Sequence, residues 1–212
     1  MNRQQASGPL AELLATVATG EFEDDGWVHL TGARWDGDDL RLALTVRTGE
    51  HEVPDQSWEI TCHSPRAQHL TLEGDGTLCL SEEHVLLWPH TQPTLQLYFR
   101  SPRTDIQSAI GALYERHAEL VGHWIPFHSF FNRLMRLADL LAAPSGMLGT
   151  GPEPLMRGYG QVLQSRGFQI SLVGPRPPQR VANGRWVEET SPLAVLILGE
   201  SFVVAPSFSA HA

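Results

Sequence analysis

Histidine is the side chain of this sequence best suited to acid–base chemistry near neutral pH, and ten are present. Two have an apolar context: His117 falls on the apolar side of a helix expected over residues 105–124, and His128 follows Pro126. We expect His117 to be a core residue that hydrogen-bonds to the backbone, which is the usual role of such a histidine. The alternative is that His117 or His128 acts as an acid or base in catalysis.

Cys62 and His63 are adjacent in the sequence and His69 follows six residues later, so this segment could carry a metal site. Neighbours on a strand point to opposite faces, so Cys62 should point inward with Ile60 while His63 points outward. A tight turn at Pro65 would place His63 and His69 on one outer face, where they could hold zinc with a third donor. No Cys-x-x-Cys or His-Glu-x-x-His spacing accompanies them. We therefore expect exposed polar residues here, with no metal site and no cofactor.

Motifs of covalent catalysis are missing from the sequence. All 15 basic residues are arginine, which excludes a Schiff-base lysine and a P-loop lysine. No Gly-x-Ser-x-Gly elbow occurs. Cys79 lies between Leu78 and Leu80 and should be exposed if the leucines are core, with His84 five residues further on. A Cys/His pair remains an alternative, but the sequence favours a chain that is not an enzyme.

An arginine-rich stretch is the best candidate for binding an anion. Residues 126–187 contain seven arginines and only Asp139 and Glu153 as acids. Glycines precede a helix start there, and backbone N–H groups at such a place can hold a phosphate. The alternative is a flexible connection whose arginines pair with the acidic half of the chain. The candidate ligand-binding residues are Arg133, Arg136, Arg157, Gly149, Thr150 and Gly151.

Aromatic residues gather around Pro126 more densely than one helical stripe can bury. They indicate either a helix pair packed on both sides or an apolar patch for a partner. The candidate interface residues are Trp124, Phe127, Phe130 and Phe131.

These residues should be positioned by an α+β domain over residues 1–212, in which strands are followed by helices and then strands. Alternating apolar residues predict a mostly antiparallel sheet over residues 27–100. Two to three helices over residues 104–166 should pack on one face, and the segment 168–205 should form strands and hairpins. The predicted helices are 9–19, 105–124 with Thr104 as cap, 126–142, and 153–166 ending at Gly167, with a loop over 143–152. Asn183-Gly184 is a strong hairpin signal.

Charge divides the chain in two. Residues 1–100 carry 16 acidic residues against 6 arginines, and residues 101–212 carry 8 against 9. Residues 1–7 are polar and no apolar stretch approaches the length of a membrane span, so we expect a cytoplasmic chain without a signal peptide.

Two hypotheses about function follow from these features. The first is a non-catalytic protein-interaction factor of the bacterial inhibitor, immunity or regulatory type, whose acidic half binds a basic partner. The alternative is a small-ligand or phosphate-binding enzyme that uses the arginine-rich region, with His117 or His128 as acid/base. We expect a protein partner or self-association, with neither nucleic acid nor membrane as a partner.

Overall fold

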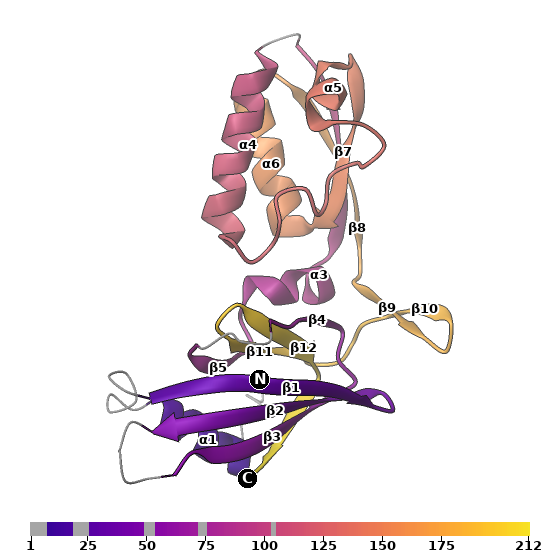
Figure 1. Ribbon diagram of the computed structural model, residues 1–212. Helices are drawn as coiled ribbons and strands as arrows, with labels where there is room; N and C mark the ends of the chain where they lie inside the picture. The colour runs from indigo at the N-terminus through magenta and orange to yellow at the C-terminus, as the bar shows by residue number, and fades with distance from the viewer. Residues whose placement is uncertain (1–7, 19–25, 49–53, 72–75, 103–104) are drawn as a thin grey trace. The chain divides into compact units, whose positions relative to one another are not determined.

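The computed structural model describes residues 8–18, 26–48, 54–71, 76–102 and 105–212. The chain divides into two compact units, residues 1–87 with 190–212 (unit 1) and residues 88–189 (unit 2). Antiparallel sheets dominate and helices are present in both units, so the α+β class is confirmed (Figure 1). The idea of a single domain over residues 1–212 stays a prediction.

Unit 1 is built from two four-stranded antiparallel sheets and a short helix. The first sheet has the order β1-β2-β3-β13, and the second has the order β4-β12-β11-β5. Helix α1 (Pro9–Val17) buries Leu10, Leu13 and Val17 in the shared core. A 3₁₀ turn, η1 (Val85–Leu87), ends the first segment of the unit. The strands are β1 (Gly26–Asp36), β2 (Asp39–Thr48), β3 (Gln56–His63), β4 (Ala67–His69), β5 (Leu78–Ser81), β11 (Ala194–Leu198), β12 (Ser201–Ala205) and β13 (Ser207–His211).

One strand pair connects the two sheets of unit 1. Strand β3 pairs with β13 in the first sheet, and β4, which follows β3 in the chain, pairs with β12 in the second. The β3–β4 and β12–β13 segments therefore pass from one sheet to the other side by side. Between them, the backbone N–H of Arg66 donates to Val204 O at 2.7 Å. The sheets therefore enclose one core, to which β2 contributes every second residue: Leu40, Leu42, Leu44 and Val46 are all buried.

Unit 2 is a three-stranded antiparallel sheet of order β7-β6-β8, covered by helices α4 and α6. Because β6 lies between β7 and β8, the segment β7–α6–β8 is a split βαβ unit. Helix α6 contacts all three strands as well as α4. The elements are α3 (Trp88–Thr91), β6 (Thr94–Arg100), α4 (Ile106–Val121), α5 (Leu137–Ala142), β7 (Ser145–Pro152), α6 (Glu153–Ser165), β8 (Gln169–Arg176), β9 (Gln179–Ala182) and β10 (Arg185–Glu188).

Local sequence signals account for several of these boundaries. Asp105 caps α4 by accepting from the backbone N–H of Gln107 and Ser108, whereas Thr104, the predicted cap, lies outside the described residues. Gly167 ends α6 with φ 84°, as predicted. Asn183 and Gly184 both have positive φ, so they form the predicted tight turn between β9 and β10.

Three predictions about elements are wrong. Residues 126–142 do not form one helix, because only α5 is helical and residues 126–136 run as turns with a bridge from Phe131 to Gly149. The 143–152 segment is not a loop but contains edge strand β7. Strand β6 does not join the sheet of the first half, since it is the central strand of unit 2. Strand β13 lies beyond the last predicted strand.

Candidate functional site

His117 on α4 is a core residue whose two ring nitrogens both have partners. Its side chain is 3% exposed, with Nδ1 2.7 Å from the Tyr159 hydroxyl and Nε2 2.6 Å from the Ile125 carbonyl oxygen. A carbonyl only accepts, so Nε2 carries the proton and Nδ1 accepts from Tyr159. Burial raises the pKa of Tyr159, which keeps this hydroxyl protonated and donating. His117 therefore holds structure together and has no nitrogen left for a substrate.

The candidate interface aromatics pack mainly inside unit 2. Phe131 is buried, with its ring centroid 5.2 Å from that of Tyr159 and 4.8 Å from that of Phe127. Phe127 also lies edge-on to His117. Trp124 is half-buried beside His123, and Phe130 is half-buried. Phe127 and Phe131 are thus brought together around His117 and Tyr159, where they support the fold.

The exposed apolar residues lie just beyond this cluster, in the segment that we name the 132–136 loop. Leu134 is 91% exposed and Met135 is 48% exposed. Asn132 fixes the loop on β7, because its backbone N–H donates to Leu148 O at 2.8 Å and its side-chain amide donates to Met147 O. Asn132 Oδ1 also accepts from Leu134 N at 3.0 Å. The loop is thus a tied turn that presents Leu134 to solvent.

Arg133 and Arg136 flank the two apolar residues of the 132–136 loop. Both are exposed, and within the described part of the chain neither makes an ion pair. His128 is also exposed and lines a hollow of about 290 Å³ beside the loop, together with Phe131, Asn132, Arg133, Met135 and Leu137. Of the predicted residues, Arg133 and His128 therefore line one hollow, whereas Arg136 is not among its lining residues.

The other candidate anion-binding residues are not assembled into that surface. Gly149 and Gly151 are buried, and a side chain at either position would run into Phe130. The backbone N–H of Thr150 donates to Phe130 O at 3.0 Å. Arg157 is paired with Glu153 at 2.6 Å. The glycines make room for the 126–136 segment, so these residues form no common anion site.

A groove of about 480 Å³ lies on unit 2, over strands β6, β7 and β8. Tyr98 and Met147 supply apolar surface there, while Arg100, Gln169 and Ser171 supply polar groups. Arg100 has no ion pair among the residues that the structure covers. The sequence did not indicate this groove, because it requires knowing that β7 and β8 flank β6.

The histidines and cysteines of unit 1 do not assemble as the metal hypothesis required. His63 and His69 lie in different sheets, and His69 packs beside Phe202. Cys62 is fully buried and Cys79 is exposed, as predicted. His84 Nδ1 accepts from Leu86 N at 3.3 Å. Within the described ranges, no group of three or more His, Cys, Asp or Glu side chains could hold a metal ion.

His63 instead makes polar contacts that sequence reasoning missed. Its Nδ1 lies 3.0 Å from Asp39 Oδ2, and its Nε2 lies 3.1 Å from Ser209 Oγ. The outward orientation of His63 was predictable from strand alternation. Its partners were not, because they depend on strands far apart in sequence.

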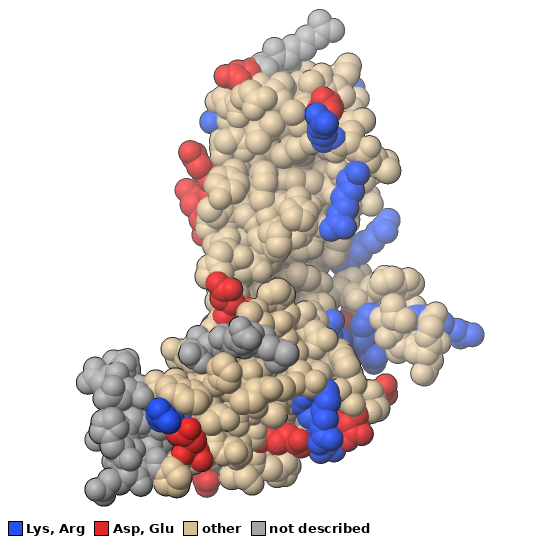
Figure 2. Space-filling view, in the orientation of Figure 1, with Lys and Arg blue, Asp and Glu red and all other residues tan. Residues whose placement is uncertain are grey.

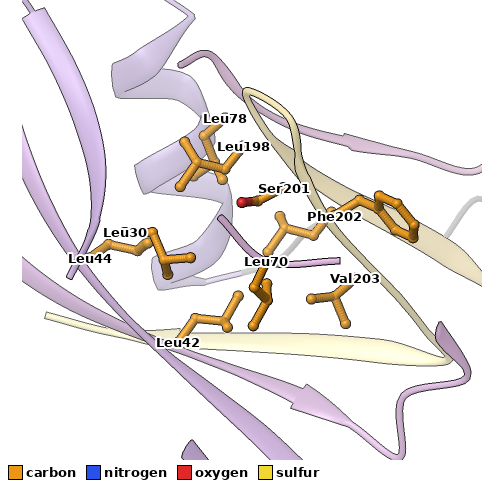
Figure 3. A pocket seen from close by; sticks show the side chains of 10 residues that line it. Leu30, Leu42, Leu44, Leu70, Leu78, Leu198, Ser201, Phe202 and Val203 are labelled. Atoms are coloured by element: carbon orange, nitrogen blue, oxygen red, sulfur yellow. The ribbon is translucent and has the colours of Figure 1, made fainter. Parts of the chain in front are cut away.

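The interior of unit 1 holds a void of about 10 Å³ between its two sheets (Figure 3). Its lining is apolar except for Ser201, whose hydroxyl accepts from Thr71 N at 2.8 Å and donates to Thr71 O at 3.3 Å. This volume corresponds to roughly one water molecule. The void is a small packing gap and is too small for a ligand.

The difference in net charge is larger between the two units than between residues 1–100 and residues 101–212. Unit 1 contains 17 acidic residues against 5 arginines, while unit 2 contains 7 against 10. On strands β1 to β3, arginines and acids pair directly, as in Arg41 with Glu59 and Arg47 with Asp55. Figure 2 accordingly shows basic and acidic side chains side by side on that part of the molecule.

Unit 2 carries most of the large hydrophobic side chains that are exposed in the described part of the chain. Of the nine large hydrophobic side chains exposed among the described residues, all but Trp35 belong to it.

No helix of the described chain is long and apolar enough to cross a bilayer. In comparisons with known proteins, the chain matches no family model, no curated protein and no solved structure.

Proposed function

We propose that the chain is a protein-interaction factor whose unit 2 binds a partner through the 132–136 loop. The observation that carries this proposal is Leu134, a leucine that is 91% exposed on a turn tied to β7. Leu134 and Met135 together form an exposed apolar surface bordered by Arg133 and Arg136, and apolar surface with a polar border supports a protein-binding site.

The fixed geometry of the loop favours binding. Asn132 already holds the turn through hydrogen bonds to Leu148 O, Met147 O and Leu134 N. A surface that is ordered before binding loses less conformational entropy in the complex, so more of the contact energy appears as affinity.

The charge of the 132–136 loop indicates the chemistry of the surface that it would bind. Arg133 and Arg136 flank Leu134 and have no acidic partner of their own among the described residues. The partner surface that complements them is an apolar pocket with carboxylates at its rim. A second copy of the chain, whose unit 1 is rich in acidic residues, is one candidate for that surface.

The acidic unit 1 supports a separate contact with a basic protein, which is the arrangement of an inhibitor, immunity or regulatory factor. Some of its carboxylates are already neutralised: Asp36, Asp55 and Glu59 pair with arginines of the same sheet. Both cysteines are free thiols, which fits a bacterial cytoplasm or another reducing compartment.

Native mass spectrometry of the protein, purified gently from its own cells, tests the proposal. We expect a complex with a second protein chain, or a dimer, that is lost in Leu134→Asp. The matched control is Tyr114→Ala, which removes another exposed hydrophobic side chain of unit 2 and should leave the complex intact. A bare monomer for the wild type, or equal loss of the complex in both variants, would contradict the assignment of the loop.

A second candidate function, small-ligand binding, is favoured by the groove over β6, β7 and β8. Arg100 and Tyr98 there would suit an anion attached to a planar ring, such as a nucleotide or an aromatic phosphate. His117 cannot serve as the acid or base, because both of its nitrogens are engaged. Thermal shift with a panel of nucleotides and phosphates is the test. Stabilisation that Arg100→Ala abolishes and Arg157→Ala preserves would place the ligand in this groove.

A further inference from the structure

Asp39, His63 and Ser209 form a continuous line of hydrogen bonds on the first sheet of unit 1. His63 ends β3, which lies between β2 and β13 in that sheet. Asp39 begins β2 and Ser209 lies on β13, so the strand order places one on each side of His63. The hydrogen bond between His63 Nδ1 and Asp39 is 3.0 Å long, and the one between His63 Nε2 and the Ser209 hydroxyl is 3.1 Å long.

The chemistry of the carboxylate fixes the direction of both hydrogen bonds. The backbone N–H of Ser64 and the His63 ring hold the pKa of Asp39 below its ordinary value of 3.8, so Asp39 is ionised at neutral pH and only accepts. With neutral imidazole, the Nδ1–H of His63 therefore donates to Asp39, and Nε2 carries the lone pair. Ser209 is left as the donor to Nε2, which is how a serine is placed to lose its proton to a base.

The backbone beside His63 adds a second observation. Ser64 has φ 45°, a left-handed conformation that residues other than glycine rarely adopt, and its N–H lies 3.0 Å from Asp39 Oδ1. Both oxygens of Asp39 are thus fixed, one by Ser64 and one by His63. Strained residues of this kind cluster at functional sites. The His63 side chain is 41% exposed, so a small reagent can reach it.

We propose that Ser209 is a nucleophile activated by His63, and that this site hydrolyses esters of small carboxylic acids. The Ser209 oxygen forms a bond to the ester carbonyl carbon while its proton passes to His63 Nε2. The bond from carbon to the alcohol oxygen then breaks, and the alcohol leaves with that proton. Water attacks the acyl-serine by the same route, which releases the acid and restores the Ser209 hydroxyl.

This activity goes beyond the binding role of unit 2 and is independent of it, since all three residues belong to unit 1. It also departs from the expectation of a chain without catalytic function. The Gly-x-Ser-x-Gly elbow is absent, but the order of the hydrogen bonds, Asp39 to His63 to Ser209, is that of a catalytic triad, an arrangement that recurs on unrelated folds.

Diisopropyl fluorophosphate is a direct probe, because it transfers its phosphoryl group to an activated serine oxygen and releases fluoride. Intact mass and peptide mapping of the folded full chain should place one adduct on Ser209. Ser207→Ala is the matched control: Ser207 lies opposite His63 in the β3–β13 register but is not its bonded partner, so labelling should continue. His63→Gln should slow labelling about 100-fold, the lower range for the loss of a general base.

Hydrolysis of p-nitrophenyl acetate provides the second readout. Ser209→Ala should reduce it to the rate of buffer alone, while Ser207→Ala retains the wild-type rate. Thermal unfolding of each variant shows that it is folded before its rate is compared. The proposal is overturned if Ser209 carries no adduct in the folded wild type, or if His63→Gln labels as fast as wild type.

Discussion

The hydroxyl of Tyr159 on α6 donates a hydrogen bond to Nδ1 of His117 on α4 over 2.7 Å, in the buried interior of unit 2. This hydrogen bond links the two helices that cover the sheet, and the second nitrogen of His117 holds the Ile125 carbonyl just after α4 ends. The carbonyl of Ile125, a buried residue beyond the helix end, thus has a hydrogen-bond donor in His117. The irregular 126–136 segment, which carries the proposed binding loop, starts from this junction.

Tyr159→Phe should destabilise unit 2 by about 1–3 kcal/mol, because it leaves His117 Nδ1 buried without a donor. Urea unfolding followed by tryptophan fluorescence measures this change. Tyr114→Phe is the control, since Tyr114 is exposed and should lose only a few tenths of a kcal/mol. Equal effects of the two substitutions would show that the buried hydrogen bond is unimportant.

Gly149→Ala should both destabilise unit 2 and displace the 132–136 loop. The added methyl group would meet the backbone of Phe130, which cannot move aside as a flexible side chain could. We expect a loss of about 1–3 kcal/mol on thermal or urea unfolding.

Gly160→Ala is the matched control for Gly149→Ala, because its methyl group would only reach ordinary contact with Ile170 at 3.5 Å. Alanine in helix α6 should instead be neutral or stabilising by up to about 1 kcal/mol. Destabilisation by Gly160→Ala as large as that by Gly149→Ala would contradict the close approach of Phe130 to β7.

The two thiols should differ sharply in reactivity. Burial raises the pKa of Cys62 to about 12, and burial also raises that of Cys79, although its side chain is exposed. A chromogenic disulfide reagent should therefore titrate one thiol slowly in the folded protein and both after unfolding in guanidinium. Mass mapping should place the native adduct on Cys79, and a rapid native reaction at Cys62 would be inconsistent with the core of unit 1.

Asp39 should contribute stability that disappears in acid. Its folded pKa lies below 3.8, so its contribution is present above that pH and is lost as the pH falls through the folded value. Asp39→Asn should lower the melting temperature at neutral pH, and the gap to wild type should close as the pH drops below 3.8. Asp38→Asn, at the exposed neighbouring position in the turn, is the control and should change the melting temperature at neutral pH less than Asp39→Asn does.

Local patterns were enough to predict much of the fold. The alternation of Leu40, Leu42, Leu44 and Val46 predicted the half-buried strand β2. Asn183-Gly184 predicted the hairpin of β9 and β10. The 126–142 helix failed for a physical reason. Phe130 and Phe131 find partners on β7, and Gly149 permits that approach, so tertiary contacts prevail over a helical apolar spacing.

The functional residues were less accessible to sequence reasoning than the fold. Arg133 and Arg136 were singled out by charge. The exposure of the Leu134 side chain between them depends on the turn that Asn132 holds against β7 by hydrogen bonds. The contact of His63 with Ser209 depends on β13 joining the sheet beside β3, although the two residues are 146 positions apart in the sequence. No local spacing encodes such a pairing.

Photo-crosslinking from position 134 tests the central claim most directly. A benzoylphenylalanine in place of Leu134, in the full chain expressed in its own cells, should form one dominant adduct with a protein, and excess wild-type chain should compete with it. Excess Leu134→Ala should compete roughly 30-fold less well, the effect of losing about 2 kcal/mol at an anchor residue. The same photoreactive residue at Tyr114 should give no such adduct. Absence of an adduct at position 134, or an adduct that Leu134→Ala competes as well as wild type, would contradict the assignment of this loop as the binding surface.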